Sequence, residues 1–194
     1  RGISCIDLEM DMKPKKEIVS SRSFGSTVTE LQDLLEATSD YCSVAVNKLR
    51  SENQVASLII VFLSTNRFRN EPQYANYAKA RLPLPSGYTP DFICAANIVL
   101  KKIYRPGYKY KKVGVMLADI MHQSKAPLDF FQPTYLDDNR KIIMDCMDEI
   151  NGKMGSHRIT YASAGIKKPW QMKREKLTPS YTTSWEHIPV VKAI

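Results

Sequence analysis

The segment VSSRSFGSTVTELQDLLEATSDYCSVAVNKLRSENQ, residues 19–54, predicts a strand that leads directly into a long helix. A β-prone run over residues 18–24 stops at Gly25. Thr29 and Gln32 have the spacing of a capping box, in which each side chain bonds the other's backbone N–H. Apolar residues then recur at helical spacing as far as Leu49. Arg22 is unexpected in this strand, because a strand that only filled a core would carry Val or Ile there. The question is whether an anionic group lies against this backbone.

Three more strands and a second helix follow. Residues 55–65 are apolar on both alternating faces, which predicts a central strand. Residues 74–84 alternate, with small or apolar side chains on one face and Tyr77, Lys79 and Arg81 on the other. PLPSG ends this strand, a helix begins at Thr89-Pro90, and residues 110–121 predict a fourth strand.

The predicted order β-α-β-β-α-β is a split-βαβ arrangement, and the fold class is α+β. Two helices cover one face of a four-stranded, antiparallel-rich sheet, and the opposite face is left to solvent or to a partner. We assign this domain to residues 13–121 and expect residues 1–12 to be a tether from domains upstream.

The C-terminal third predicts a second, small α+β domain over residues 138–194. Residues 122–137 lack periodicity and contain two prolines, which is typical of a linker. Asp138 is expected to cap a helix with apolar residues on one side, namely Ile143, Met147, Ile150 and Met154. Residues 157–166 resemble one more strand.

Composition favours a soluble intracellular protein with an anionic partner. The chain has 28 Lys and Arg against 20 Asp and Glu, a formal charge of +8, which suits nucleic acid or an acidic protein surface. The longest apolar run is far short of the ~20 residues that a membrane span requires, so we expect no membrane partner and a cytoplasmic location. The four cysteines lie in apolar contexts that predict buried, reduced thiols: Cys5, Cys42, Cys94 and Cys146.

Signatures of catalysis and of metal binding are absent from the sequence. The three histidines are far apart and have no metal-ligand spacing, and no phosphate-binding glycine loop or nucleophile elbow occurs. We therefore predict no catalytic residue, no metal ligand and no cofactor within these 194 residues.

The densest basic feature is KKIYRPGYKYKK, residues 101–112, with six cations, three tyrosines and no acid. Clustered cations release the counterions condensed on phosphates, so this composition favours nucleic-acid binding. The alternative is a solvated helix end at which Lys101 and Lys102 complement the helix dipole. For Arg22 the alternative is a surface ion pair with Glu17 or Glu30.

Four stretches, SRSFG, NKLRSENQ, KKVGVMLADI and WQMKREKLTPSYTT, make the chain similar to the C-terminal half of UmuC-type Y-family DNA polymerases. The resemblance implies that residues 13–121 are the little finger, also called the polymerase-associated domain. It implies error-prone translesion synthesis in the SOS response and DNA damage tolerance. The palm, with its catalytic carboxylates and Mg²⁺, would lie outside these residues, so this fragment alone would not polymerise.

A little finger would contact primer–template phosphates without sequence preference. The family's Arg-Ser-aromatic-Gly stretch matches residues 22–25, which places the cation of Arg22 against the template backbone. Together with the other basic segments, the predicted DNA-binding residues are Arg22, Ser23, Phe24, Gly25, Tyr77, Lys79, Arg81, Lys109, Lys111 and Lys112.

The resemblance also implies a sliding-clamp peptide of the form Gln-Leu-x-Leu-Phe. Here the matching residues after Pro127 are Leu128, Asp129, Phe130 and Phe131, and the lost glutamine removes a polar contact. The alternative is that the two phenylalanines pack on the protein's own surface.

Further partners implied by the family are a processed UmuD-type protein and a recombinase filament, both through the C-terminal domain. Its basic tail is equally suited to contact DNA: Lys167, Lys168, Trp170, Lys173 and Arg174. Two other functions stay open. One is a protein-interaction module for an acidic partner. The other is an RNA-binding split-βαβ domain, which is disfavoured because the strands lack an aromatic stacking run.

Overall fold

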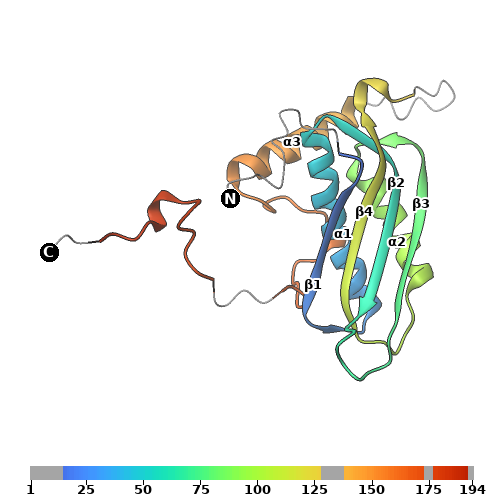
Figure 1. The fold of residues 1–194 in the computed structure, drawn as a ribbon. Helices are drawn as coiled ribbons and strands as arrows, with labels where there is room; N and C mark the ends of the chain where they lie inside the picture. Colours follow the sequence, from blue (N-terminus) through green and yellow to red (C-terminus); the bar gives the residue numbers. More distant parts are fainter. Residues whose placement is uncertain (1–14, 128–137, 173–176, 192–194) are drawn as a thin grey trace, which may run out of the picture.

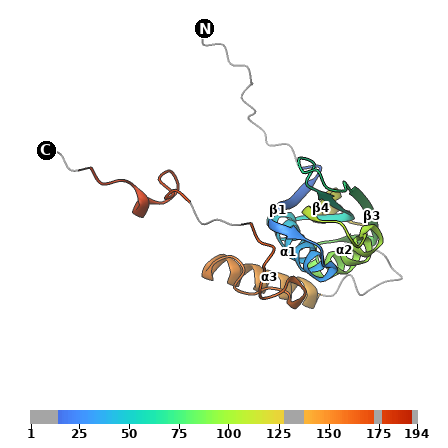
Figure 2. The same ribbon diagram turned by 90° about the horizontal axis from the view of Figure 1, so that it is seen from below.

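The computed structural model describes residues 15–127, 138–172 and 177–191 (Figure 1). Four strands form one antiparallel sheet in the order β1-β4-β2-β3. Their bounds are β1 Ile18–Val28, β2 Gln54–Thr65, β3 Ala75–Ser86 and β4 Tyr110–His122. Helices α1 (Leu31–Ser51) and α2 (Thr89–Ile103) both cover the same face of this sheet (Figure 2). The predicted split β-α-β-β-α-β fold is confirmed.

The core lies between the two helices and the covered face of the sheet. The edge strand β1 contributes Ile18, Phe24 and Val28 to it, and β3 contributes Leu82. The buried stripe of α1 runs through Leu34, Cys42 and Leu49, as its 3.6-residue spacing predicts. The sheet contributes alternate residues of its two central strands, namely Ile59, Val61 and Leu63 of β2 and Val113, Val115 and Leu117 of β4. Because successive side chains of a strand point to opposite faces, the residues between these core positions lie on the other face of the sheet.

Three local predictions differ from the structure. The predicted capping box is wrong. Glu30 is the N-cap of α1, its side chain does not cap the helix N–H groups, and Gln32 donates to Glu36 one turn further along. Strand β1 continues past Gly25, because a bulge lets Val28 pair with Tyr110 of β4. Strand β3 runs through PLPS to Ser86, because an edge strand tolerates prolines on its unpaired side.

The predicted helix of the C-terminal region is α3, Asp138–Met154, and it lies outside α1, on the side away from the sheet (Figure 2). Its inner side differs from the prediction, since Met144 is buried whereas Ile143 and Met154 are exposed. The side of α3 that faces α1 is set by an ion pair, because Asp148 of α3 binds Arg50 of α1. Other 3-10 turns are Gln123–Lys125, Ala162–Ala164 and Trp185–His187.

The strand predicted over residues 157–166 does not form. This segment contains the 3-10 turn Ala162–Ala164 and packs against α1, with Ala164 buried. It lies over a helix instead of a free sheet edge, so its backbone has no strand to pair with. The helix α3 and short turns are the regular structure of the described part of 138–191.

Residues 167–172 bring the C-terminal segment back to the main core. Trp170 is 2% exposed and contacts Phe24 of β1 and Tyr41 of α1. Lys168 forms a 2.6 Å ion pair with Asp40, both nearly buried. The suggestion that Lys168 and Trp170 contact DNA is therefore wrong, because both are used within the fold. Lys173 and Arg174 lie outside the described residues.

The cysteines differ from the expected uniform burial. Cys42 is buried in the core, whereas Cys94 and Cys146 are exposed on the outer sides of α2 and α3, and Cys5 lies outside the described residues. In the described ranges, no helix is both long and apolar enough to cross a bilayer.

Candidate nucleic-acid interface on the open face of the sheet

The face of the sheet that α1 and α2 leave uncovered is called the open face. Its residues follow from the strand register, because directly paired residues point to the same side. One row crosses all four strands and consists of Ser21 (β1), Gly114 (β4), Phe62 (β2) and Tyr77 (β3). This row lies on the side opposite to the buried Val113 and Val115.

Three further rows complete the open face. On one side of the Phe62 row lies the row of Ser23, Lys112, Ser64 and Ala75. On the other side lie the row of Val19, Met116, Ile60 and Lys79 and then the row of Ala118, Leu58 and Arg81. These four rows contain three cations, three serines and no carboxylate, with apolar side chains at the centre.

The three cations of the open face differ in the contacts that their charged groups make with the rest of the chain. Lys79 makes no hydrogen bond or ion pair with another described residue. Lys112 has its ammonium 5.8 Å from the centre of the Phe62 ring. Arg81 forms a 2.9 Å ion pair with Asp119, and the Ser57 hydroxyl donates to the same carboxylate. That hydroxyl, with Arg81, holds the pKa of Asp119 below its usual value, so the carboxylate stays ionised and offsets the charge of Arg81.

Arg22, whose cation was predicted to contact the template backbone, does not belong to the open face. It pairs with the buried Val113 and lies two residues before the buried Phe24, so it is on the helix-covered side at the sheet edge. It is exposed and forms no ion pair with Glu17 or Glu30. Its charge acts on Tyr41, whose pKa is raised to about 12 by burial and by Asp40 while Arg22 opposes the shift.

Phe24 and Gly25 are also unavailable as DNA contacts. The Phe24 side chain is 1% exposed and packs in the core against Trp170. The N–H of Gly25 donates to the Trp170 carbonyl at 3.3 Å. Of the four residues matched to the family stretch, only Ser23 belongs to the open-face rows.

The basic segment 101–112 is divided among different surfaces. Lys101 and Lys102 are exposed on the last turn of α2, the helix that covers the opposite face of the sheet (Figure 2). Three cations contact groups outside the open face: Arg105 lies over the Tyr74 ring at 5.1 Å, Lys109 pairs with Glu71 at 3.1 Å, and Lys111 donates to the Phe24 carbonyl. Lys112 is the one cation of this segment that the register places on the open face.

Sequence reasoning missed Phe62 and Ser64. Phe62 lies in a strand that is apolar on both faces, so its pattern resembles pure core. Gly114 was the available signal, because an isolated glycine within a strand often marks a close approach of other groups. A Cβ at Gly114 would lie 2.4 Å from Cζ of Phe62 and 2.3 Å from Cβ of Ser21.

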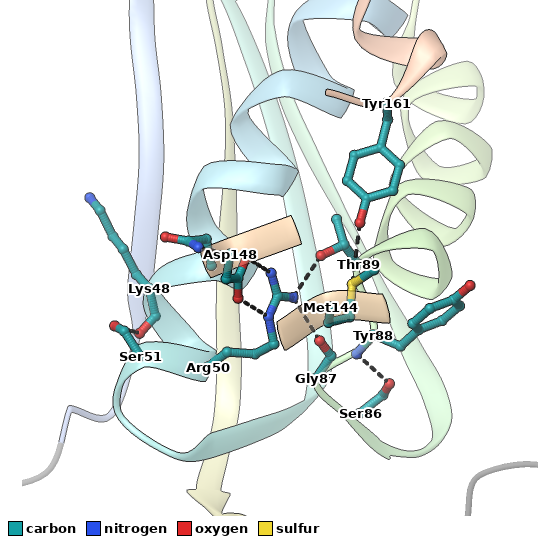
Figure 3. Close-up of polar contacts among 11 residues, drawn as sticks. Lys48, Arg50, Ser51, Ser86, Gly87, Tyr88, Thr89, Met144, Asp148 and Tyr161 are labelled. Atoms are coloured by element: carbon teal, nitrogen blue, oxygen red, sulfur yellow. Dashed lines mark hydrogen bonds and ion pairs between the residues drawn. The ribbon is translucent and has the colours of Figure 1, made fainter. Parts of the chain in front are cut away.

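A second site lies on the helical side, where α3 is attached (Figure 3). The Arg50 guanidinium donates to both carboxylate oxygens of Asp148, at 2.7 and 2.8 Å, and also to the Thr89 hydroxyl at 2.7 Å and the Gly87 carbonyl at 2.9 Å. Tyr161 donates to the sulfur of Met144 at 3.2 Å. The contacts of Arg50 with Asp148, Thr89 and Gly87 and of Tyr161 with Met144 join segments that are distant in the sequence, which indicates a structural role.

A cavity of about 300 Å³ lies beside this contact, between α1 and the segment that follows α3. Its two carboxylates are already paired, since Asp148 binds Arg50 and Asp40 lies 2.6 Å from Lys168 and 3.7 Å from His157. No group of three His, Cys, Asp or Glu residues in the described ranges has the arrangement of a metal site. The predicted clamp peptide, Leu128, Asp129, Phe130 and Phe131, lies outside the described residues.

The fold defines a split-βαβ domain with one uncovered sheet face. Residues 15–130 match the impB/mucB/samB family C-terminal domain, and residues 141–191 match a domain of unknown function (DUF4113). The chain belongs to the impB/mucB/samB family.

The chain is similar to Protein UmuC of Salmonella typhimurium, with 39% identity over 193 residues that cover 99% of this chain and 46% of the relative. It is 40% identical to Protein SamB of Salmonella typhimurium over 192 residues, covering 98% of this chain and 45% of SamB. It is 36% identical to Protein MucB of Escherichia coli over 191 residues, with the same coverage. The chain thus spans about half the length of these curated relatives, and the resemblance to UmuC-type proteins is confirmed.

Two solved structures are also similar. One is DinB from Sulfolobus solfataricus, with a TM-score of 0.45 and 13% identity, covering 55% of this chain and 29% of DinB. The other is an insertion ternary complex of Dbh DNA polymerase, with a TM-score of 0.44 and 14% identity, covering 57% of this chain and 31% of that chain.

Proposed function

We propose that the open face binds DNA phosphates without sequence preference, as part of the C-terminal region of a translesion DNA polymerase. The observation that carries the proposal is the register, which brings Lys79, Arg81 and Lys112 onto one uncovered face without any carboxylate in the four rows. Ammonium and guanidinium groups release counterions from phosphates, and serine hydroxyls donate to phosphate oxygens. Such contacts serve an enzyme that copies any template.

The activity of the whole protein is part of the same proposal and rests on membership of the family. We infer a DNA-directed DNA polymerase that acts in the SOS response in the bacterial cytoplasm, with Mg²⁺ held by a palm outside this chain. We expect this chain alone to be inactive as a polymerase, because its sequence offers no catalytic carboxylate set.

Protein partners of the whole enzyme are proposed on the same basis. The sliding clamp would bind residues 128–131, and a processed UmuD-type protein or a recombinase filament would bind the C-terminal region. Support for a docking segment comes from large apolar side chains that solvent reaches, since Trp185 is 90% exposed and Val190 and Val191 are similarly open.

The alternative function is a protein-interaction module whose open face binds an acidic partner. It is favoured by one observation, the apolar centre of the open face, where Ile60, Phe62 and Met116 are neighbours. Phosphate binding alone does not require these side chains.

A salt titration of duplex binding tests the proposed function. We expect weak binding of duplex DNA at low salt, with log K falling linearly with log salt. Lys79→Ala and Lys112→Ala should each reduce the slope by about one. Arg81→Ala should reduce the slope less, because Asp119 already offsets its charge.

The matched control is Lys101→Ala with Lys102→Ala, which removes two exposed cations behind the sheet. This double variant should leave the slope nearly unchanged. Absence of duplex binding at low salt, or an equal loss with the control, would contradict the assignment of the open face.

A further inference from the structure

Two aromatic rings are neighbours on the open face, and phosphate binding does not account for them. Phe62 of β2 and Tyr77 of β3 are direct cross-strand partners. Tyr77 is 71% exposed and Phe62 is half-buried, so solvent reaches both. A tyrosine ring offers a flat apolar surface with one polar end, which is why tyrosine is enriched at interfaces.

The Phe62 ring is held across the sheet. The next residue in its row is Gly114, and a Cβ there would lie 2.4 Å from Cζ and 2.9 Å from Cε2 of Phe62. The ring therefore extends over the backbone of β4 in the space that the missing side chain leaves. Ser21, the following residue of the row, is small as well. The row therefore has small side chains on the β1 side, and it ends at the Tyr77 ring on β3.

Cations lie on both sides of the ring pair. Lys112 belongs to the row on one side and Lys79 to the row on the other, each two residues away along its strand from a member of the Phe62 row. Two residues of strand span roughly 7 Å. Lys112 already lies over the Phe62 ring at 5.8 Å, and Lys79 has no partner among the described residues.

We propose that Phe62 and Tyr77 form a stacking surface for the unpaired bases of single-stranded nucleic acid, with Lys79 and Lys112 contacting the flanking phosphates. This inference rests on the proposed function, since it names the part of the template that the open face takes. Aromatic rings with interleaved cations are the arrangement that binds single strands without sequence preference, because every base has a π-face. A duplex hides those faces within its stack.

The test compares three probes by fluorescence anisotropy with the 194-residue chain. The probes are a thymidine oligonucleotide of about 12 nucleotides, the same backbone without bases, and a duplex of equal length. Tyr77→Leu removes the ring and keeps an apolar side chain, whereas Tyr77→Phe keeps the ring. Phe62→Leu repeats the test at the second ring, and Trp185→Leu controls for the loss of an exposed ring elsewhere. Urea unfolding of each variant verifies that it is folded.

We expect Tyr77→Leu to weaken binding of the thymidine oligonucleotide roughly 5- to 150-fold, the range for loss of one stacked base. Tyr77→Phe and Trp185→Leu should bind as the parent chain does. The abasic strand should bind the parent chain weakly, and Tyr77→Leu should change that binding little. Binding of the duplex should also be unaffected by Tyr77→Leu.

Three outcomes would overturn the inference. The first is that Tyr77→Leu weakens binding of the thymidine and abasic strands equally. The second is that Tyr77→Leu and Tyr77→Phe weaken binding of the thymidine strand equally. The third is that Tyr77→Leu and Phe62→Leu both leave binding of the thymidine strand unchanged. Failure of the proposed function is a separate result, namely no duplex binding at low salt. If the thymidine strand binds in a way that depends on the Tyr77 ring while the duplex does not bind, the result supports this inference and rejects binding of duplex phosphates by the open face.

Discussion

The Trp170 indole meets the Phe24 ring edge-on, with ring centres 6.2 Å apart and planes inclined by 70°. The Tyr41 ring also meets the indole edge-on, with ring centres 5.8 Å apart and planes inclined by 80°. Trp170 belongs to the segment matched by the second family model, whereas Phe24 and Tyr41 belong to the segment matched by the first. The C-terminal segment therefore supplies a core residue to the split-βαβ domain.

Removing this ring should destabilise the whole chain. We expect Trp170→Ala to lower the free energy of unfolding by about 3–5 kcal/mol, the usual cost of deleting a buried aromatic side chain. Urea denaturation followed by far-UV circular dichroism measures the loss. Trp185→Ala is the matched control, because Trp185 is 90% exposed and its loss should change stability by less than about 0.5 kcal/mol. Equal effects of the two substitutions would show that the C-terminal segment does not share the core.

The Arg50–Asp148 pair should couple α1 to α3. We expect Arg50→Ala to cost about 2–3 kcal/mol, because hydrogen bonds to charged groups are among the stronger ones and Asp148 loses two. A double-mutant cycle with Asp148→Ala should give a coupling energy of about 1–3 kcal/mol. Lys48→Ala, an exposed cation in the same last turn of α1, controls for loss of charge near the helix end. A coupling energy near zero would refute the attachment of α3 through this pair.

Gly114 should tolerate no side chain. In Gly114→Ala the new methyl group would lie 2.3 Å from Cβ of Ser21 and 2.4 Å from Cζ of Phe62. We expect a loss of about 1–3 kcal/mol in urea denaturation, as for other overpacked sites.

Gly152→Ala provides the contrast for this prediction. Nothing lies within 4 Å of a Cβ at Gly152, which is exposed near the end of α3. Replacing a helical glycine by alanine should stabilise the chain by about 0.5–1 kcal/mol. If Gly114→Ala unfolds at the same urea concentration as the parent chain, Phe62 does not occupy the space above the glycine.

Stability should fall in alkali partly because of Tyr41. Burial, reinforced by Asp40, raises the pKa of its phenol to about 12, while the unfolded chain keeps a pKa near 10. Between these two pH values the unfolded state loses the proton first, so stability declines as the pH rises from 10 to 12. Tyr41→Phe should flatten this decline in urea denaturation carried out across that window. Tyr110 and Tyr161, whose pKa values are also raised by burial, stay in both proteins. An unchanged alkaline slope in Tyr41→Phe would count against the raised pKa.

Much of the fold was predictable because its signals are local. The alternation around Tyr77, Lys79 and Arg81 placed these three on one side of an edge strand, and the structure confirms that side as the open one. The start of α2 at Thr89-Pro90 was equally local, since proline fits the first helical turn. The strand expected at 157–166 failed because β-forming residues still need a strand edge to pair with.

The amino-acid sequence by itself determined the order of strands and helices, the two-sidedness of β3 and the family, because periodicity and motifs are properties of neighbouring residues. Only the tertiary structure decided that Arg22 lies on the helix-covered side, that Phe62 joins Tyr77, and that Trp170 completes the core. Those relationships depend on register across strands and on contacts between distant segments. A shift of one residue in pairing moves every side chain of a strand to the opposite face, and no local pattern fixes that choice.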